Sequence, residues 1–306
     1  MKISPGELAR GDFARARSTR GEIDTGRDRH TSFHPLNYGV LGTVSKLIKT
    51  CVLRISSDKL YFILSEQAVN GGVQIWCELP QAHFFDEYAM EGVSAEFNEI
   101  FLEFIPENLL RAMKTAQNAK WVKIKLTKKH SPCLTVEVDL PTIGSHQRCV
   151  THDIPVHVIP RRHWQDFEEP EMPNFDVSIA MPQIKLLKNV IDKMKNLSNF
   201  MVLSANQSGD MKLMVETDMV SVSTHFQDLL NPTWRRDDSE SQTMADRDDK
   251  AFAHARIDLR RFSQFLAGQQ VNPTRVICNI VSNKTVHFYV MHDDVSLQYF
   301  MPVVAA

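Results

Sequence analysis

Histidine stands next to aspartate at two places in the chain, and such pairs could act in acid–base catalysis or bind a metal ion. The two candidates are His152-Asp153 and the run His292-Asp293-Asp294. Both lie in or beside predicted strands, where adjacent residues point to opposite faces of the sheet. Neighbouring side chains therefore cannot converge on one ion or one substrate atom. We expect neither a catalytic site nor a metal site at these positions.

Sequence motifs of nucleotide-dependent and metal-dependent enzymes are missing from the chain. It has no GxxxxGK[ST] phosphate loop, no GxGxxG turn and no HExxH pair. Asp248-Asp249 lies in a polar stretch, 231–250, which we expect to be a mobile loop that would hold catalytic carboxylates poorly. The five cysteines are an odd number without a CxxC pair, which predicts neither disulfides nor structural zinc. We therefore predict a non-enzymatic protein without a cofactor.

Lysine and arginine recur on the polar faces of four predicted amphipathic helices. In residues 181–198, at about 100° per residue, the apolar side chains fall on one face and the lysines on the other. One such face is typical of an ordinary solvated helix, but four of them favour sequence-independent attraction to DNA phosphates. The candidate DNA-facing residues are Lys46, Lys49, Arg111, Lys114, Lys185, Lys188, Lys195, Arg260 and Arg261.

The bulk composition limits the class of protein that can carry these faces. A length of 306 residues allows two domains, and 43% hydrophobic with 24% charged residues is typical of a globular protein. The formal net charge of −2 argues against nucleic-acid binding over the whole surface, yet it is compatible with one basic face. No apolar run approaches the roughly 20 residues that a bilayer crossing needs.

Hydrophobic periodicity and turn residues predict the individual elements. The predicted helices span about 40–48, 106–120, 181–198 and 258–266, and Asp258 is placed to cap the last one. The strands predicted in the first half are 51–55, 60–64, 73–79, 84–90, 99–104, 121–127, 133–140 and 148–159. Those in the second half are 177–181, 200–205, 211–216, 220–226, 252–257, 275–281, 285–290 and 295–301.

The elements occur in the same order twice. Each half has a helix, a strand–turn–strand hairpin, further strands, a second helix, a second hairpin and a final strand. The turn at Ser57–Leu60 in the first half corresponds to Gly209–Leu213 in the second. Self-similarity with so long a period indicates a duplicated domain rather than a solenoid. We predict an α+β fold of two like domains.

Composition also predicts the domain limits. Residues 1–35 alternate arginine with acidic residues and have too few apolar residues to bury a face, which predicts a disordered, atypical N-terminal segment. The first domain is predicted at 36–160 and the second at 176–306, with the mobile loop at 231–250. Residues 161–175 between them contain prolines and acidic residues without periodicity, which predicts an extended connector.

Several segments of the chain are distinctive as written: LRISSDKLYFIL (53–64), NGGVQIWCEL (70–79), MEGVSAEFNEI (90–100), LLRAMKTAQNAKWVKIKLT (109–127), VTHDIPVHVIPRRHW (150–164), FLAGQQVNPT (265–274) and HDDVSLQYFMP (292–302). They resemble the sliding-clamp superfamily and, within it, the Hus-one type of subunit of the heterotrimeric DNA-damage checkpoint clamp. The resemblance runs from about Leu36 to the C-terminus.

The resemblance implies a half-ring of two clamp domains, with antiparallel sheets outside and the four helices lining a hole for double-stranded DNA. It implies two paralogous partner subunits, of the Rad-nine and Rad-one types, and an ATP-driven clamp loader. It further implies recruitment of checkpoint and repair proteins, a nuclear location with room for a cytoplasmic pool, and no membrane partner. Trp164 and Phe167 could contribute to a peptide-docking surface beside the connector, or merely cover a domain edge.

Two other functions stay open. One is a homotrimeric replication processivity clamp, which a stable ring of this chain alone would support. The more distant one is a metal-dependent nuclease that uses the scattered histidines and aspartates.

One departure from the repeat stands out at the start of the first domain. Strand 177–181 leads directly into the first helix of the second domain, whereas Arg27–Pro35 (RDRHTSFHP) cannot supply the equivalent strand. We hypothesise that residues 1–35 come from an alternative first exon or a mispredicted gene start. The first domain would then lack one strand and leave hydrogen-bonding groups without their partners.

Overall fold

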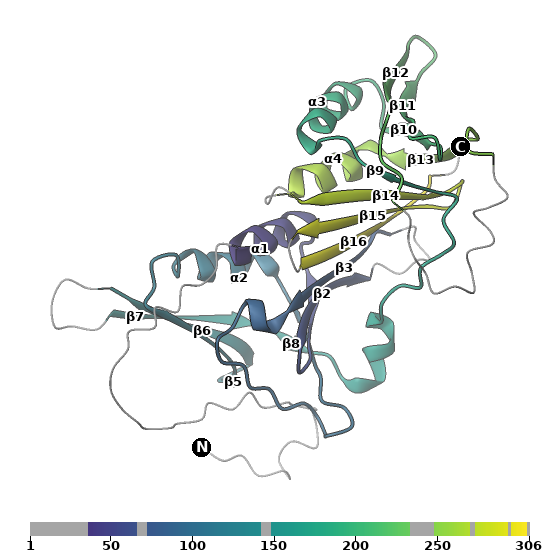
Figure 1. Ribbon diagram of the computed structural model, residues 1–306. Helices are drawn as coiled ribbons and strands as arrows, with labels where there is room; N and C mark the ends of the chain where they lie inside the picture. The colour runs from purple at the N-terminus through teal and green to yellow at the C-terminus, as the bar shows by residue number, and fades with distance from the viewer. Residues whose placement is uncertain are drawn as a thin grey trace. The chain divides into compact units, whose positions relative to one another are not determined.

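The structure of the protein is a computed structural model that describes residues 36–65, 72–141, 148–232, 248–269, 273–292 and 295–304 (Figure 1). It divides into two compact units. Unit 1 comprises the chain up to Leu64 together with Glu78–Glu168, and unit 2 comprises Ser65–Cys77 together with Glu169–Ala306. The assignment of Ser65–Cys77 to unit 2 is a feature that the sequence does not predict. Residues 1–35 and most of the predicted loop at 231–250 lie outside the described residues.

Unit 1 contains two antiparallel sheets and a pair of helices. The helices are α1 (Leu36–Leu47) and α2 (Pro106–Lys114), which pack against each other. One sheet has the order β8-β4-β1-β2, and the other the order β5-β6-β7. Strand β3 (Gln74–Pro80) lies next to β2 in the sheet. Its residues up to Cys77 belong to unit 2, and those from Glu78 onward belong to unit 1. The other strands are β1 (Cys51–Ile55), β2 (Lys59–Ser65), β4 (Ile100–Phe104), β5 (Trp121–Lys128), β6 (Pro132–Leu140), β7 (Arg148–Pro155) and β8 (His157–Val158).

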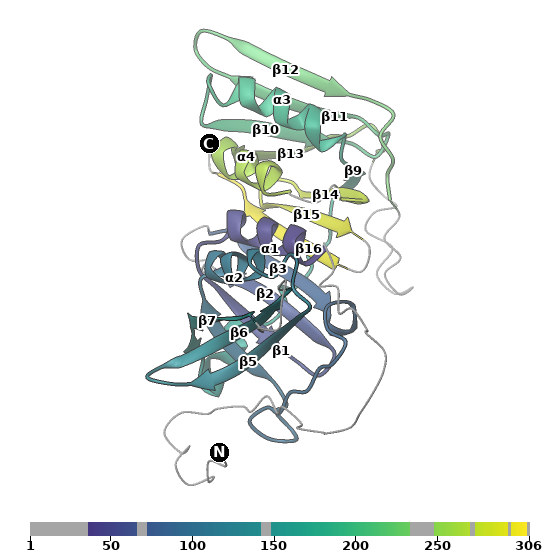
Figure 2. The ribbon, with the colours of Figure 1, turned by 90° about the vertical axis from the view of Figure 1, so that its left-hand side faces the viewer.

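Unit 2 repeats this architecture. Its helices are α3 (Ile184–Met194) and α4 (Leu259–Gly268), which lie side by side in both views (Figures 1 and 2). The two sheets have the orders β9-β14-β15-β16 and β12-β11-β10-β13. The strands are β9 (Val177–Ala180), β10 (Phe200–Ala205), β11 (Met211–Glu216), β12 (Ser221–Phe226), β13 (Ala253–Asp258), β14 (Arg275–Val281), β15 (Thr285–His292) and β16 (Val295–Pro302).

The element order confirms the predicted α+β fold and its duplication. Each unit has a helix, four strands, a second helix and further strands in succession. Corresponding strands also pair alike: β1 pairs with β2 and β4, and β10 pairs with β11 and β13, all antiparallel. In unit 2, β9 precedes α3 and pairs with β14, whereas the described part of unit 1 begins with α1 itself. Among the described residues, no helix is both long and apolar enough to cross a membrane.

The helix predicted at 181–198 is shorter than its apolar periodicity suggests. It begins at Ile184 after Pro182 and the N-cap Gln183, and it ends at Met194. Leu187, Ile191 and Met194 are buried, as the apolar face predicts. Leu197 fits the same spacing but lies beyond the helix with 42% of its surface exposed. The periodicity therefore continues past the C-terminal end of the helix.

The second helix of unit 1 was predicted to reach Lys120, and this limit is wrong. Helix α2 ends at Lys114, and the hydroxyl of Thr115 donates a hydrogen bond to the Ala112 carbonyl oxygen at 2.7 Å. A side chain that bonds to its own preceding turn competes with continuation of the helix. The residues that follow form turns before β5.

The strand predicted at 84–90 is also wrong. After the short 3₁₀ helix η3 (Gln81–His83), this stretch is irregular. Its aromatic side chains hold it in place: the Tyr88 hydroxyl donates to the Ser56 carbonyl oxygen at 2.6 Å, and the Phe85 and Tyr88 rings lie 5.8 Å apart. Burial of the phenol also raises the pKa of Tyr88.

The single strand predicted at 148–159 is two strands in different sheets. β7 ends at Pro155 and pairs with β6, whereas β8 pairs with β4. The break follows from Pro155, because proline has no N–H to donate to a ladder. The connector predicted as extended at 161–175 instead begins with a 3₁₀ helix, η4 (Arg161–Phe167).

Candidate DNA-facing helices and docking pocket

The predicted DNA-facing residues of unit 1 lie at or just beyond the C-terminal ends of its two helices. Lys46 occupies the last turn of α1, and Arg111 and Lys114 the last turn of α2; all three side chains are exposed. Cations at this end are favoured because the helix dipole is negative there. Lys49 is exposed too, but it follows the end of α1 rather than lying on it.

The basic residues of unit 2 are distributed differently. Lys185 and Lys188 lie on α3, with no ion pair among the residues that the structure describes, whereas Lys195 is the C-cap. Arg260 and Arg261 occupy the first turn of α4, where the Asp258 carboxylate accepts hydrogen bonds from their backbone N–H groups at 2.7 and 3.0 Å. The predicted cap at Asp258 is thus confirmed.

Two of the predicted basic residues pair with carboxylates on their own helix. The Arg111 guanidinium lies 3.2 Å from the Glu107 carboxylate, and the Lys195 ammonium lies 2.6 Å from the Asp192 carboxylate. Exposed pairs of this kind contribute about 0–1 kcal/mol. They reduce the local positive charge of the helix surface without removing it.

The histidine–aspartate candidates do not form a common site. His152 Nε2 lies 2.9 Å from the Thr115 hydroxyl, whereas the Asp153 carboxylate accepts from Lys129 at 2.5 Å and from Thr135 at 2.6 Å. These two hydrogen bonds hold the pKa of Asp153 below its usual range. Asp293 and Asp294 lie outside the described residues. Within the described ranges, no group of three or more His, Cys, Asp or Glu side chains is placed to hold a metal ion.

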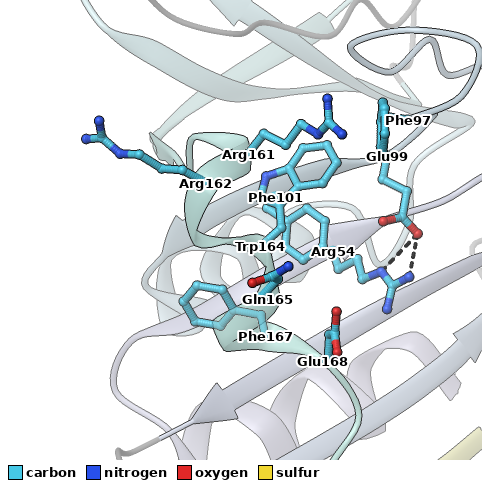
Figure 3. Close-up of a pocket in the computed structure, with 10 residues that line it drawn as sticks. All are labelled: Arg54, Phe97, Glu99, Phe101, Arg161, Arg162, Trp164, Gln165, Phe167 and Glu168. Carbon is cyan, nitrogen blue, oxygen red and sulfur yellow. Dashed lines mark hydrogen bonds and ion pairs between the residues drawn. The ribbon is translucent and has the colours of Figure 1, made fainter.

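Trp164 and Phe167 lie in the wall of a pocket that is formed by unit 1 alone (Figure 3). We call it the aromatic–arginine pocket. It has a volume of about 600 Å³. Helix η4 provides one side of the pocket, and residues of β1, β4 and the segment before β4 provide the other. Its lining residues are Arg54, Phe97, Glu99, Phe101, Arg161, Arg162, Trp164, Gln165, Phe167 and Glu168.

Stacking and one hydrogen bond fix Trp164 in this wall. Its indole ring stacks on the buried ring of Phe101, with centroids 4.6 Å apart and planes at 24°. The indole N–H donates to the Ile159 carbonyl oxygen at 3.0 Å. An aromatic pair of this kind is favourable by about 0.5–1.5 kcal/mol beyond its area burial. The pocket wall is therefore preorganised, which lowers the entropy lost when a ligand binds.

The three arginines of the pocket differ in their partners. Arg54 pairs with Glu99, and its two hydrogen bonds, at 3.1 and 2.5 Å, are the dashed lines of Figure 3. The Arg161 guanidinium instead lies over the Phe97 ring, 3.1 Å from its centroid, and Arg162 contacts His163. No carboxylate pairs with Arg161 or Arg162 in the described part of the chain. Both can therefore bind an acidic group, because a guanidinium binds carboxylate in a two-pronged geometry.

The sequence pointed to Trp164 and Phe167 but missed the arginines and Phe97. The pair Arg161-Arg162, which only His163 separates from Trp164, was the available signal, because arginine and aromatic residues are enriched at interfaces. Phe97 gave no comparable signal, since it contacts Arg161 across 64 positions of the chain. Lys193, exposed in the last turn of α3, is a further basic residue of this helix that the prediction did not include.

Comparison with known proteins agrees on family and fold. Residues 35–305 match the family model described as Hus1-like protein. The chain is 57% identical over 262 residues to checkpoint protein HUS1 of Homo sapiens, covering 86% of this chain and 92% of that protein. It is 29% identical over 242 residues to checkpoint protein hus1 of Schizosaccharomyces pombe, covering 77% and 82%.

Two solved structures resemble the fold at low sequence identity. PCNA from Thermococcus kodakaraensis superposes with a TM-score of 0.61 at 15% identity, covering 88% of this chain and 96% of that one. Proliferating cellular nuclear antigen from Entamoeba histolytica superposes with a TM-score of 0.63 at 10% identity, covering 88% and 95%. The duplicated α+β units are therefore those of a sliding clamp.

Proposed function

Because the chain belongs to the family of Hus1-like proteins and has the sliding-clamp fold, it is a checkpoint clamp subunit, and we propose that it forms part of a ring around double-stranded DNA. The observation that carries the proposal is the family match over residues 35–305 together with the duplicated fold. In the proposed assembly the sheets form the outer wall and the four helices face the DNA. The protein acts in the nucleus as a scaffold without catalysis.

We propose further that the ring is a heterotrimer with two paralogous subunits, of the Rad-nine and Rad-one types. An ATP-driven loader opens the ring, since the chain lacks a phosphate-binding loop of its own. The loaded ring then recruits checkpoint and repair proteins. A ring that holds DNA by topology needs only weak, sequence-independent contacts along the phosphates.

The assembly is tested by the behaviour of the chain with and without the two paralogues. Alone, the chain should elute in size-exclusion chromatography as a single 35.0 kDa subunit. After co-expression with both paralogues it should elute as a 1:1:1 complex. The loader and ATP should place that complex on circular DNA in a salt-resistant form, and cutting the circle should release it. A stable homotrimer of the chain alone would instead support a homotrimeric replication clamp.

We propose that the helix lysines and arginines supply the phosphate contacts. Changing Lys185, Lys188 and Lys195 to glutamine should weaken DNA binding by the assembled ring. It should also reduce the slope of log K against log salt by about 1 for each phosphate contact that is lost. The measurement is a salt titration of binding to short duplex DNA, repeated with an unrelated sequence to show that the effect does not depend on sequence.

The control removes charge from the same unit at two positions away from the helices, one partly and one fully exposed. Lys212 lies on β11, and Lys284 lies in the turn between β14 and β15. Changing both to glutamine should leave the salt slope unchanged. If the control and the helix variant reduced the salt slope equally, the overall charge of the protein, rather than the helix surface, would attract the DNA.

We propose that the aromatic–arginine pocket docks a partner peptide that carries an acidic and an aromatic side chain. The support is the pair Arg161 and Arg162 beside the fixed ring of Trp164. Changing both arginines to glutamine should weaken binding of such a peptide at least tenfold, since charge-assisted hydrogen bonds are lost. Isothermal titration with a synthetic peptide measures the change. The control is Arg148→Gln, which replaces an exposed arginine on β7. This variant should bind the peptide as tightly as the unaltered chain does.

A further inference from the structure

The chain from Arg161 to Glu168 forms one wall of the aromatic–arginine pocket, and its contacts follow the period of a 3₁₀ helix. Such a helix has about three residues per turn, so side chains three positions apart lie in one row along its axis. His163 and Asp166 share one row, and their side chains lie 3.6 Å from each other. Neither lines the pocket, whereas the other six residues of the segment do. Helix η4 therefore turns two rows toward the pocket and one row away from it.

The part of this wall that faces the pocket changes the sign of its charge along the helix. Arg161 and Arg162 begin η4, Glu168 directly follows it, and all three side chains are exposed. Figure 3 shows the two arginines at the top of the view and Glu168 at the bottom. At about 2.0 Å per residue, roughly 12 Å of helix separates Arg162 from Glu168. The pocket therefore has a cationic end and an anionic end.

The carboxylate at the anionic end is available to a cation from outside. Within the described ranges, Glu168 forms no ion pair with a lysine, arginine or histidine. Arg54, the third arginine of the lining, is already engaged by Glu99. Its guanidinium also lies over the rings of Tyr61 and Phe101, 5.0 and 5.6 Å from their centroids. A cationic group of a ligand can therefore pair with Glu168 without displacing an ion pair of the described chain.

These charges and rings fit an extended peptide better than a small ion. A single carboxylate or phosphate could occupy only one end of the pocket, because the ends are about 12 Å apart along the helix. Between the ends, Trp164 and Phe167 offer aromatic surface that is only partly buried. In an extended peptide, residues two positions apart lie on one face at about 6.6 Å, and residues four apart at about 13 Å. A peptide can therefore place charges of opposite sign at the two ends and a ring between them.

We propose that Glu168 determines which partner peptide the pocket binds, an inference that rests on the proposed docking of an acidic and aromatic peptide. Counted from the arginine end, the peptide has an acidic residue, an aromatic residue two positions further and a basic residue four positions further. The acidic side chain binds Arg161 and Arg162, the ring lies against Trp164, and the basic side chain pairs with Glu168. A peptide with a second acidic residue in the last position is rejected, because two carboxylates then face each other.

Isothermal titration of the full chain with short peptides tests the proposal. The probes are TDTFTKT and, because a peptide can bind in either direction, TKTFTDT; the threonine spacers favour the extended form. We take the probe that binds more tightly and replace its lysine. Its affinity should fall about threefold with glutamine, as for the loss of an exposed ion pair, and about tenfold with aspartate.

Variants of the chain locate the effect. Glu168→Gln should bind the lysine and glutamine probes equally, and Glu168→Lys should prefer the aspartate probe. Asp166→Asn is the matched control, because it removes a carboxylate from the same helix on the row that faces away from the pocket. It should keep the preference of the unaltered chain for lysine.

Two results would overturn this inference alone. Equal affinity of the unaltered chain for the lysine and glutamine probes would show that nothing in the pocket binds the basic side chain. Loss of the preference in Asp166→Asn as well as in Glu168→Gln would show that the overall charge of the helix, rather than Glu168, is responsible. In both cases the docking of an acidic and aromatic peptide would stand. Failure of every probe to bind would instead contradict the docking itself and the inference with it.

Discussion

Replacing Phe265 by alanine is expected to lower the free energy of unfolding of unit 2 by about 4 kcal/mol, the middle of the range for a buried phenylalanine. Phe265 lies on the inner face of α4 with 0% of its surface exposed. Its ring stacks on Phe288 of β15 at 4.7 Å and contacts Tyr299 of β16 at 5.0 Å. The substitution would therefore leave a cavity between the helix and two strands of the sheet.

Chemical denaturation followed by circular dichroism measures this loss. Met219→Ala is the matched control, because Met219 is an apolar residue of the same unit with 96% of its surface exposed. Its effect should stay within about 0.5 kcal/mol. A cost below about 1 kcal/mol for Phe265→Ala would contradict the packing described here, since loss of the ring would then leave no cavity of consequence.

The stability of unit 2 is expected to fall by about 3 kcal/mol between pH 7 and pH 4 through one histidine. His287 is buried on β15 between the rings of Phe175 and Phe300, at 5.5 and 4.4 Å, and its Nδ1 lies 2.9 Å from the Asn279 amide nitrogen. Burial lowers its pKa from 6.5 to about 4. In the unfolded chain the same side chain takes up a proton near pH 6.5.

The sign of the effect follows from these two pKa values. Above pH 6.5 the histidine is neutral in both states and contributes no pH dependence. Between pH 6.5 and about 4 only the unfolded state is protonated, so stability is lost steadily as the pH falls. Below about 4 both states are protonated and the loss is complete.

Two glutamine variants separate this histidine from the carboxylates that titrate in the same range. The slope of the unfolding free energy against pH is proportional to the difference in bound protons between the unfolded and folded states. Between pH 6.5 and 4, His287→Gln should lower this difference by up to one proton. His225→Gln, at an exposed position on β12, should keep the slope of the unaltered chain. If the two variants had the same slope, the buried histidine would not be the source.

The strand pattern of unit 2 could be predicted because each strand has its own alternation and a turn at each end. The limits of β10 and β11 were predicted to the residue, and the turn between β14 and β15 was placed at Ser282–Lys284, where Asn283 has a positive φ of 56°. Helix ends were harder to predict. Apolar spacing continues to Leu197, but nothing in that spacing shows where the backbone stops being helical.

The aromatic–arginine pocket could be predicted only in part, because its contacts join residues far apart in the chain. Arg54 and Glu99 are 45 positions apart, and neither has a local pattern that points to the other. Trp164 stood out by its type and by its place in the connector, yet its partner Phe101 looked like any core residue of a strand. The stretch 84–90 was misassigned for the same reason, since the Tyr88 hydroxyl bonds to Ser56 on a distant turn.

The carboxylates beside the basic helix residues bear on how fast the proposed ring could travel. Asp192 lies 2.6 Å from Lys195, and Glu107 lies 3.2 Å from Arg111. Exposed pairs of this kind are worth about as much as thermal energy, roughly 0.6 kcal/mol, so each cation can exchange its carboxylate for a phosphate and back with little barrier. A phosphate contact that Arg111 or Lys195 breaks as the ring moves is replaced by the carboxylate beside it. Such a surface has low friction, which suits a ring that diffuses along DNA and must not halt at any one step.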